Sequence, residues 1–494
     1  MSARNVCSAL AAPAILLMTA ACVHAPDGME DALPVAIPGE WTAGAGSMEA
    51  AVPGGAWWDS FGDPELSSLI AETLENNRDL RMAAARIDAA AAQARIAGAD
   101  LLPSLGASAT AARRRQNFIG FPSLGSPASG AASSAAPEVV STTSTTLGVS
   151  LDAGWEPDLW GRIRSGTSAA AADLHAAGAD YEAARLSLAG QVARTWFAIA
   201  ESSRLLDLAE RTVESFGRTV DQVRSRFARG LRPSLDLRLA LTSLHTAEAA
   251  LDQLRSQRAA LVRQIEVLAG RYPEGGIERR PDLPPLPPAI PAGLPAELIG
   301  RRPDMAAAEQ RLHAAGFRVT EARRSLYPRL TLTGRYGTQS ERLGDLLDGD
   351  FTVWSLVAGL VQPLFQGGKL RAGVELADAR EREALEGYVG AALNAYREVE
   401  SALEAERILS GVESGYTAAS EQALAARRLA EERYRAGLDG FLTVLGAQRR
   451  DIDAESRLIS IRRLRLDTRV DLHLALGGGF GSGSIEIATG DGNS

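Results

Sequence analysis

Residues 79–105 (DLRMAAARIDAAAAQARIAGADLLPSL) and residues 304–330 (DMAAAEQRLHAAGFRVTEARRSLYPRL) are two versions of one pattern, separated by a constant offset of 225. Each is an alanine-rich, helix-forming stretch that ends just before a proline. A second match, RFARGL at 226–231 and RYRAGL at 433–438, has an offset of 207. Because both matches keep their order along the chain, we infer that one long unit has been duplicated.

Two stretches with strand character follow the proline in each half. Apolar residues alternate with polar or small ones over 147–155 and 329–336, and more weakly over 104–112, whereas 351–361 is apolar on both faces. We therefore expect four strands of roughly 9–11 residues, a length that crosses a bilayer at a tilt. Residues 113–141 between the first two strands are rich in Ser, Ala, Gly and Pro and are expected to form an exposed loop.

Long proline-free stretches follow the second strand of each half. Residues 165–229, if one helix, would extend about 100 Å at about 1.5 Å per residue. A 3-4 spacing of apolar residues, typical of a coiled-coil seam, lies within it: Val213, Phe216, Val220, Val223 and Phe227. The break at 229–233 turns the chain into a second helix that runs to about Leu268, and residues 370–475 repeat this helical hairpin.

Composition excludes several classes of protein. The chain has 494 residues, a net charge of −9 and only 5% aromatic residues, which favours closely packed helices over a nucleic-acid-binding protein. Its two cysteines, Cys7 and Cys22, lie near the N-terminus, so the body has no disulfide and no cysteine nucleophile. The five histidines are scattered, so we expect no metal site, and no Ser-His-Asp order stands out.

The N-terminus carries an export signal. Arg4 precedes a short apolar stretch, so residues 1–21 are predicted to be a secretory signal peptide. Ala20 and Ala21 before Cys22 resemble a bacterial lipobox, although Thr19 replaces the usual leucine. We expect Cys22 to become the lipidated first residue of the mature chain; an ordinary signal peptide with an incidental cysteine is the alternative. Val23, where an aspartate would resemble an inner-membrane retention signal, favours the outer membrane.

These segments divide the chain into six parts. They are a signal peptide (1–21), a lipidated N-terminal segment (22–65), a first repeat (66–270), a proline-rich connector (271–303), a second repeat (304–475) and a Gly/Ser-rich tail (476–494). The Arg113, Arg114 and Arg115 run is expected to be a solvated loop end or a lipopolysaccharide contact.

Four membrane strands cannot close a barrel alone, because open edges leave backbone groups unpaired in hydrocarbon. Three copies would supply about twelve strands, enough for a closed β-barrel. The expected fold is therefore an α/β membrane channel, in which a trimeric barrel continues as a long α-helical periplasmic tube. The alternative is a soluble sheet under a helical bundle.

Three motifs carry a resemblance to a known family: WWDSFGDPEL at 57–66, WEPDLWGRIR at 155–164 and RRPDMAAAE at 301–309. They resemble the NodT/OprM-type branch of the TolC-like outer membrane factors. The resemblance implies a homotrimer in outer membrane lipids that docks to a periplasmic adaptor and an inner-membrane pump, usually of the resistance-nodulation-division type. It also implies a passive exit duct for drugs or small toxic solutes, with no enzymatic activity and no cofactor besides the lipid on Cys22. The alternatives are the exit duct of a type I protein secretion system and a periplasmic lipoprotein scaffold or hydrolase without a pore.

The same resemblance suggests which residues form the entrance. In the family, Arg-aromatic-x-x-Gly-Leu turns lie at the periplasmic tip of the tunnel, and the matching positions here are Phe227, Arg229 and Gly230, and Tyr434, Arg435 and Gly437. A solvated helix end is the alternative for the arginines. The family often narrows its entrance with aspartates, one of them in a Leu-Asp-Ala-Gln stretch, but residues 445–448 read Leu-Gly-Ala-Gln, so Gly446 replaces the acid. Asp236 and Asp439 are the nearest candidate substitutes.

Overall fold

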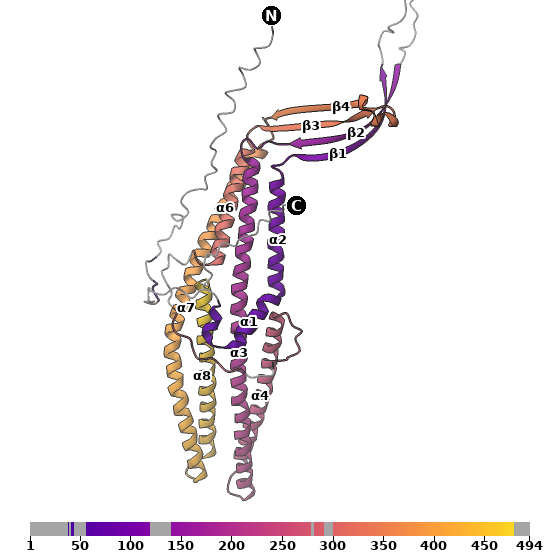
Figure 1. Cartoon of the computed structure of the whole chain (residues 1–494). Helices are drawn as coiled ribbons and strands as arrows, with labels where there is room; N and C mark the ends of the chain where they lie inside the picture. Colours follow the sequence, from indigo (N-terminus) through magenta and orange to yellow (C-terminus); the bar gives the residue numbers. More distant parts are fainter. Residues whose placement is uncertain are drawn as a thin grey trace, which may run out of the picture. The chain divides into compact units, whose positions relative to one another are not determined.

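The computed structural model describes residues 38, 41–43, 56–118, 140–277, 281–290 and 300–478. The chain divides into two units, residues 1–39 and 40–494, and nearly all of the description concerns the second. Cys22, the signal peptide and most of the tail lie outside the described residues. The elements that matter below appear in Figure 1: α1 (Pro64–Asn76), α2 (Arg78–Ala99), β1 (Ser104–Phe118), β2 (Val140–Trp155), α3 (Arg162–Ala228), α4 (Ser234–Leu268), α6 (Pro303–Arg324), β3 (Arg329–Ser340), β4 (Thr352–Val361), α7 (Lys369–Arg435) and α8 (Phe441–Ala475).

The internal duplication is confirmed element by element. Helices α2 and α6 both have 22 residues, α3 and α7 both have 67, and α4 and α8 both have 35. Their first residues differ by 225 in the first pair and by 207 in the other two, which are the offsets of the sequence matches. Each half is therefore a helix, two strands and a helical hairpin, in that order.

The four strands form one antiparallel sheet in the order β1-β2-β3-β4. The predicted strand lengths were wrong for the first hairpin, because β1 has 15 residues and β2 has 16. The predicted loop over 113–141 is correspondingly shorter, and Arg113, Arg114 and Arg115 lie inside β1, paired with Thr145, Ser144 and Thr143. Backbone pairing across the hairpin extends these strands through Ser, Thr and Arg residues that show no apolar alternation.

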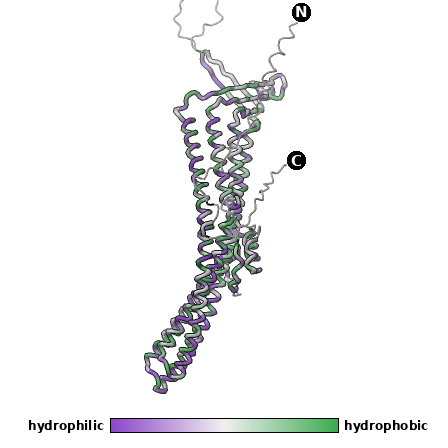
Figure 2. Tube along the Cα trace, turned by 90° about the vertical axis from the view of Figure 1, so that its left-hand side faces the viewer, coloured by the Kyte–Doolittle hydropathy of each residue, from purple (hydrophilic) through white to green (hydrophobic). Residues whose placement is uncertain are grey.

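The hairpins α3–α4 and α7–α8 lie side by side, as Figure 1 shows. Of the predicted seam, Phe216, Val220 and Val223 are buried, whereas Phe227 is 41% exposed. Hydrophobic and hydrophilic residues alternate along the helices (Figure 2). Within the described ranges, no helix combines the length and the apolar content that crossing a membrane requires.

A hydrophobic core forms where α1 and the short helix Trp57–Phe61 pack against α3 and α8. The Trp57 ring stacks on His473 of α8 at 5.1 Å between centroids. Neither ring nitrogen of His473 has a hydrogen-bond partner among the described residues. Burial, followed by the nearby charge of Arg469, lowers the pKa of His473 to about 4. His473 is therefore a neutral packing residue at ordinary pH.

Candidate functional site

Both hairpin turns at the end of the long helices have the same backbone geometry. In the first, the Leu231 N–H donates to the Arg226 carbonyl at 2.9 Å and Gly230 has φ of 72°. In the second, the Leu438 N–H donates to the Arg433 carbonyl at 2.9 Å and Gly437 has φ of 77°. This is the Schellman arrangement, in which glycine adopts a left-handed conformation that costs other residues free energy. The RxxxGL repeat in the sequence is the signature of these two turns.

Tyr434 is the side chain that joins the two turns. Tyr434 is 4% exposed, and its ring contacts two guanidinium groups, Arg226 at 4.8 Å and Arg232 at 4.9 Å from the ring centroid. Arg226 also donates hydrogen bonds to the carbonyls of Tyr434 and Arg435, both at 3.4 Å. Phe441 lies 5.9 Å from the same ring. We call Tyr434, Arg226 and Arg232 the tip latch, because they connect the α3–α4 hairpin to the α7–α8 hairpin.

The side chains of the other predicted tip residues are not part of this contact. Phe227 is exposed. Arg229 is also exposed, and its side chain donates a hydrogen bond to the Ser225 hydroxyl one turn away, at 2.9 Å. The exposed Arg435 pairs through its side chain with Glu431 one turn away, at 3.6 Å. These two arginine side chains have the geometry of solvated helix ends.

The two candidate aspartates differ in environment. Asp439 accepts a hydrogen bond from Arg433 at 2.7 Å, and this bond holds the pKa of Asp439 below its ordinary value. Asp236 is 9% exposed in the first turn of α4. Neither carboxylate contacts the tip latch through an interaction that the structure describes. Asp439 is therefore an ionised group neutralised by its own arginine.

Gly446 lies on α8 with open space around it. A Cβ atom added there would meet no heavy atom within 4 Å, while Leu445 and Ala447 on either side are buried. The next acidic residue along α8 is Asp451, which is 4% exposed and pairs with Arg427 of α7 at 3.2 Å. Burial raises the pKa of Asp451 above its ordinary value. The position of the missing acid is thus available, and the nearest acid is used in packing α7 against α8.

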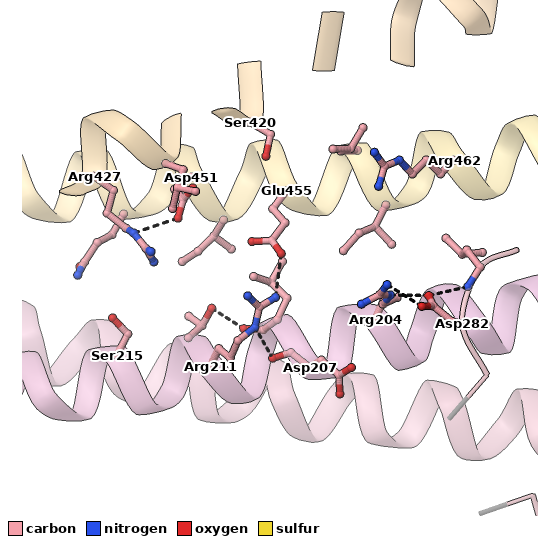
Figure 3. A pocket seen from close by; sticks show the side chains of 18 of the residues that line it. Arg204, Asp207, Arg211, Ser215, Asp282, Ser420, Arg427, Asp451, Glu455 and Arg462 are labelled. Atoms are coloured by element: carbon pink, nitrogen blue, oxygen red, sulfur yellow. Dashed lines mark hydrogen bonds and ion pairs between the residues drawn. The ribbon is translucent and has the colours of Figure 1, made fainter. Parts of the chain in front are cut away.

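A groove of about 950 Å³ lies between α3, α7, α8 and residues 282–286. Charged side chains of both signs line it, and Figure 3 shows how they face one another. Arg211 of α3 pairs with Glu455 of α8 at 2.8 Å. Arg204 donates two hydrogen bonds to Asp282 of the connector, at 2.6 and 2.7 Å. The groove therefore combines ion pairs with apolar side chains such as Phe216 and Leu466.

The two faces of the sheet differ: one carries the polar residues of β1, β2 and β3, with exposed valines only on β4, and the other is apolar. On the polar face, Asp152 accepts hydrogen bonds from Arg335 at 2.6 Å and from Ser108 at 2.7 Å. The alternate residues of the same strands form the other face, which is dominated by large apolar side chains exposed in the single chain: Leu105, Val149, Leu151, Trp155, Tyr336, Trp354, Leu356 and Leu360. An exposed apolar face of this extent marks contact with a partner or a membrane.

Sequence reasoning identified Tyr434 but missed its partners. Arg226 begins the RFARGL segment, and Arg232 follows it directly, so both lay next to the predicted turn. Their contact with Tyr434 spans 208 residues in the case of Arg226, and nothing in the local pattern indicates it. The Asp152–Arg335 pair was also missed, because its two strands come from different halves.

Comparisons with known proteins agree with this architecture. The family model described as outer membrane efflux protein matches residues 69–271 and 294–478. Outer membrane protein OprJ of Pseudomonas aeruginosa is 36% identical over 472 residues, which cover 95% of this chain and 95% of that protein. Toluene efflux pump outer membrane protein TtgI of Pseudomonas putida is 31% identical, covering 94% of this chain and 97% of that protein. The solved structure of the outer-membrane channel OprN has a TM-score of 0.80 at 28% identity, covering 90% of this chain and 98% of that one.

Proposed function

The chain belongs to the outer membrane efflux protein family, and we propose that three copies form the passive exit duct of a tripartite pump for drugs or small toxic solutes. Membership of this family gives the general role of the chain, which is that of an outer membrane channel component of an efflux pump. The family consists of channel proteins, and we attribute no chemistry to this chain, so energy would come from an inner-membrane partner.

The main support for a trimer is that the four-stranded sheet has two open edges. Strands β1 and β4 are its edges, and each presents unpaired backbone groups along one side. Such groups cost several kcal/mol each in hydrocarbon, so about twelve strands from three copies would close the edges. In a closed barrel the apolar face would contact lipid, and the face with Asp152 and Arg335 would line the aqueous pore.

A crosslink between the two edge strands tests this assembly. Within one chain β1 and β4 are separated by two strands, so a disulfide between them must join two copies. We expect Ala109→Cys on β1, combined in turn with single cysteines at positions 354–358 of β4, to give a covalent trimer on a non-reducing gel. Ala109→Cys with Val149→Cys, which pair directly across β1 and β2, is the intramolecular control. Monomer alone in every combination would refute the proposed trimer.

The tip latch is the proposed closed gate. Tyr434 is held between Arg226 and Arg232 of the neighbouring hairpin, so separating the hairpins breaks both contacts. The sequence-based candidates Phe227, Arg229, Gly230, Arg435, Gly437, Asp236 and Asp439 would shape or flank this gate. Gly446 would leave the duct without one of the family's acidic constrictions.

Lipidation of Cys22 is a further part of the proposal and rests on the sequence. Cys22 lies outside the described residues, and its lipidation is supported by the preceding Ala20 and Ala21. We expect labelled palmitate to be incorporated into the wild type and not into Cys22→Ser.

The partners would be a periplasmic adaptor and a resistance-nodulation-division pump. The hairpin tips and the groove between α3, α7 and α8 would offer the surface on which they dock.

The substrate class is tested in cells. TtgI is by its name the outer membrane protein of a toluene efflux pump. We expect deletion of this gene to increase susceptibility to drugs or solvents and the intact gene to restore resistance. Unchanged susceptibility together with a secreted protein retained in the cell would favour the type I secretion alternative.

A further inference from the structure

Three consecutive arginines lie in the distal part of β1, the part farthest from the helices along the strand. Arg113, Arg114 and Arg115 are all exposed. The β1–β2 hairpin continues past the last pairing of β2 with β3, Leu147 with Ser340, so these residues lie where the hairpin extends beyond the four-stranded region (Figure 1). The expected role of the strand as a pore wall does not require three cations here.

Strand alternation separates the three side chains. Ser108 shares its face with Asp152, to which it donates a hydrogen bond, so even-numbered residues of β1 belong to the polar face. Arg113 and Arg115 therefore lie on the apolar face, in line with Leu105, and Arg114 lies on the polar face. The hydrogen bond from Arg115 to Ser141 at 3.1 Å, and that from Ser141 to Asn117 at 2.9 Å, confirm that odd-numbered positions share a face here.

The distance along the strand places this pair at the edge of the apolar band. At about 3.4 Å per residue, Arg113 and Arg115 lie roughly 27 and 34 Å from Leu105. The hairpin bends where it leaves the four-stranded region (Figure 1), so these are lengths along the chain. A straight strand tilted by about 40° would give heights of roughly 21 and 26 Å, against an apolar band about 25 Å tall in outer membrane barrels. If Leu105 lies at the inner boundary, Arg115 lies at the headgroups of the outer leaflet, and the long side chain of Arg113 extends to them from just inside the band.

The surroundings of the pair favour an anionic ligand. Their cross-strand neighbours are the hydroxyl residues Thr145 and Thr143. In the part of the chain that the structure describes, the side chain of Arg113 forms no ion pair or hydrogen bond, and that of Arg115 bonds only to the Ser141 hydroxyl. Guanidinium groups bind phosphate with two parallel hydrogen bonds, and hydroxyl groups donate to the same oxygens.

We propose that Arg113 and Arg115 form a binding site for the phosphate groups of the lipid A glycolipid in the outer leaflet. The inference rests on the outer membrane location and adds a ligand that the duct function does not require. Phosphate is the shared chemistry, and the source we propose is the lipid headgroup. Arg114 supplies a matched control, because it is an arginine of the same strand that points to the opposite face.

The test uses the full-length protein purified in mild detergent. Binding of bisphosphorylated lipid A and of dephosphorylated lipid A is measured by native mass spectrometry for the wild type, Arg113→Gln/Arg115→Gln and Arg114→Gln. We expect the double variant to bind bisphosphorylated lipid A at least about tenfold more weakly, since it loses charge-assisted hydrogen bonds. Arg114→Gln should bind like the wild type, and dephosphorylated lipid should bind weakly to all three.

Equal affinity of wild type and double variant would overturn the inference, as would an equal loss in Arg114→Gln. Full displacement of the lipid by millimolar inorganic phosphate would also overturn it, in favour of a free-anion site. Failure of the proposed duct is distinguishable, because it appears as a protein that gives no covalent trimer in the crosslink between β1 and β4. A protein that gives the covalent trimer, while the double variant retains lipid A, refutes only the lipid site.

Discussion

Removing both arginines of the tip latch is expected to open the duct. Each guanidinium lies within 4.9 Å of the Tyr434 centroid, and an exposed cation–π contact contributes about 0.5–1 kcal/mol. Arg226→Ala/Arg232→Ala therefore removes about 1–2 kcal/mol per chain. If three chains open together, the closed state loses about 3–6 kcal/mol, which multiplies the open-to-closed ratio by about 10² to 10⁴.

Two assays measure this change. Single-channel recording in planar bilayers gives the open fraction directly. In cells, a bulky hydrophilic antibiotic that the outer membrane excludes should enter through the open variant and lower the inhibitory concentration. Thermal unfolding of the purified variant checks that the trimer remains folded.

The matched control is Tyr434→Phe. The Tyr434 hydroxyl is buried and has no hydrogen-bond partner among the described residues, so the latch does not use it. Phe keeps the ring that both arginines contact, and we expect this variant to stay as closed as the wild type. A double arginine variant as closed as the wild type would refute the latch, and so would a Tyr434→Phe channel that opens fully.

Three further predictions concern the helices. Gly446→Asp should fold normally, because a Cβ there meets nothing within 4 Å, and three new carboxylates should shift the reversal potential toward cation selectivity. Gly190→Ala should destabilise the protein by about 1–3 kcal/mol in thermal unfolding, because overpacking forces α3 and α8 apart. Its Cβ would lie 2.6 Å from a side chain of α8, whereas Gly217→Ala has open space and serves as the control. His473→Phe should reduce the loss of unfolding free energy at acidic pH, measured by unfolding the protein at a series of pH values. The folded pKa of about 4 lies below the ordinary 6.5, so the stability is complete above pH 6.5 and lost as the pH falls through 4. The loss in the wild type reaches about 3 kcal/mol per chain.

Each of these has a result that contradicts it. An unchanged reversal potential would mean that position 446 lies away from the ion path. Equal melting of Gly190→Ala and Gly217→Ala would mean that α3 and α8 separate without strain. A loss at acidic pH as large in His473→Phe as in the wild type would assign that loss to another group.

The helical part of the fold follows from local sequence. Proline-free length, the 3-4 seam and the two RxxxGL turns are properties of neighbouring residues, and they predicted α3, α4, α7 and α8 to within a few residues. The identical lengths of the paired helices follow from the duplication. These elements could be predicted because helix formation and capping depend on contacts within a few turns.

The rest depends on pairings that local pattern does not encode. The distal parts of β1 and β2 are Ser, Thr and Arg residues whose strand conformation comes from the opposite strand. The tip latch needs Arg226 and Tyr434, which belong to different halves of the chain. Tyr434 was found because its turn is repeated, and Arg226 was not recognised because charged residues at helix ends are usually solvated.

Housing both halves in one chain has a consequence for how the cylinder comes together. Six separate halves would require five encounters, whereas three fused chains require two, and each avoided encounter spares about 4–15 kcal/mol of lost translational and rotational freedom. Fusion also frees the halves to diverge: Tyr434 is buried, whereas Phe227 at the equivalent position is exposed. In a ring of six identical half-chains the two positions could not differ, because every substitution would appear in all six copies.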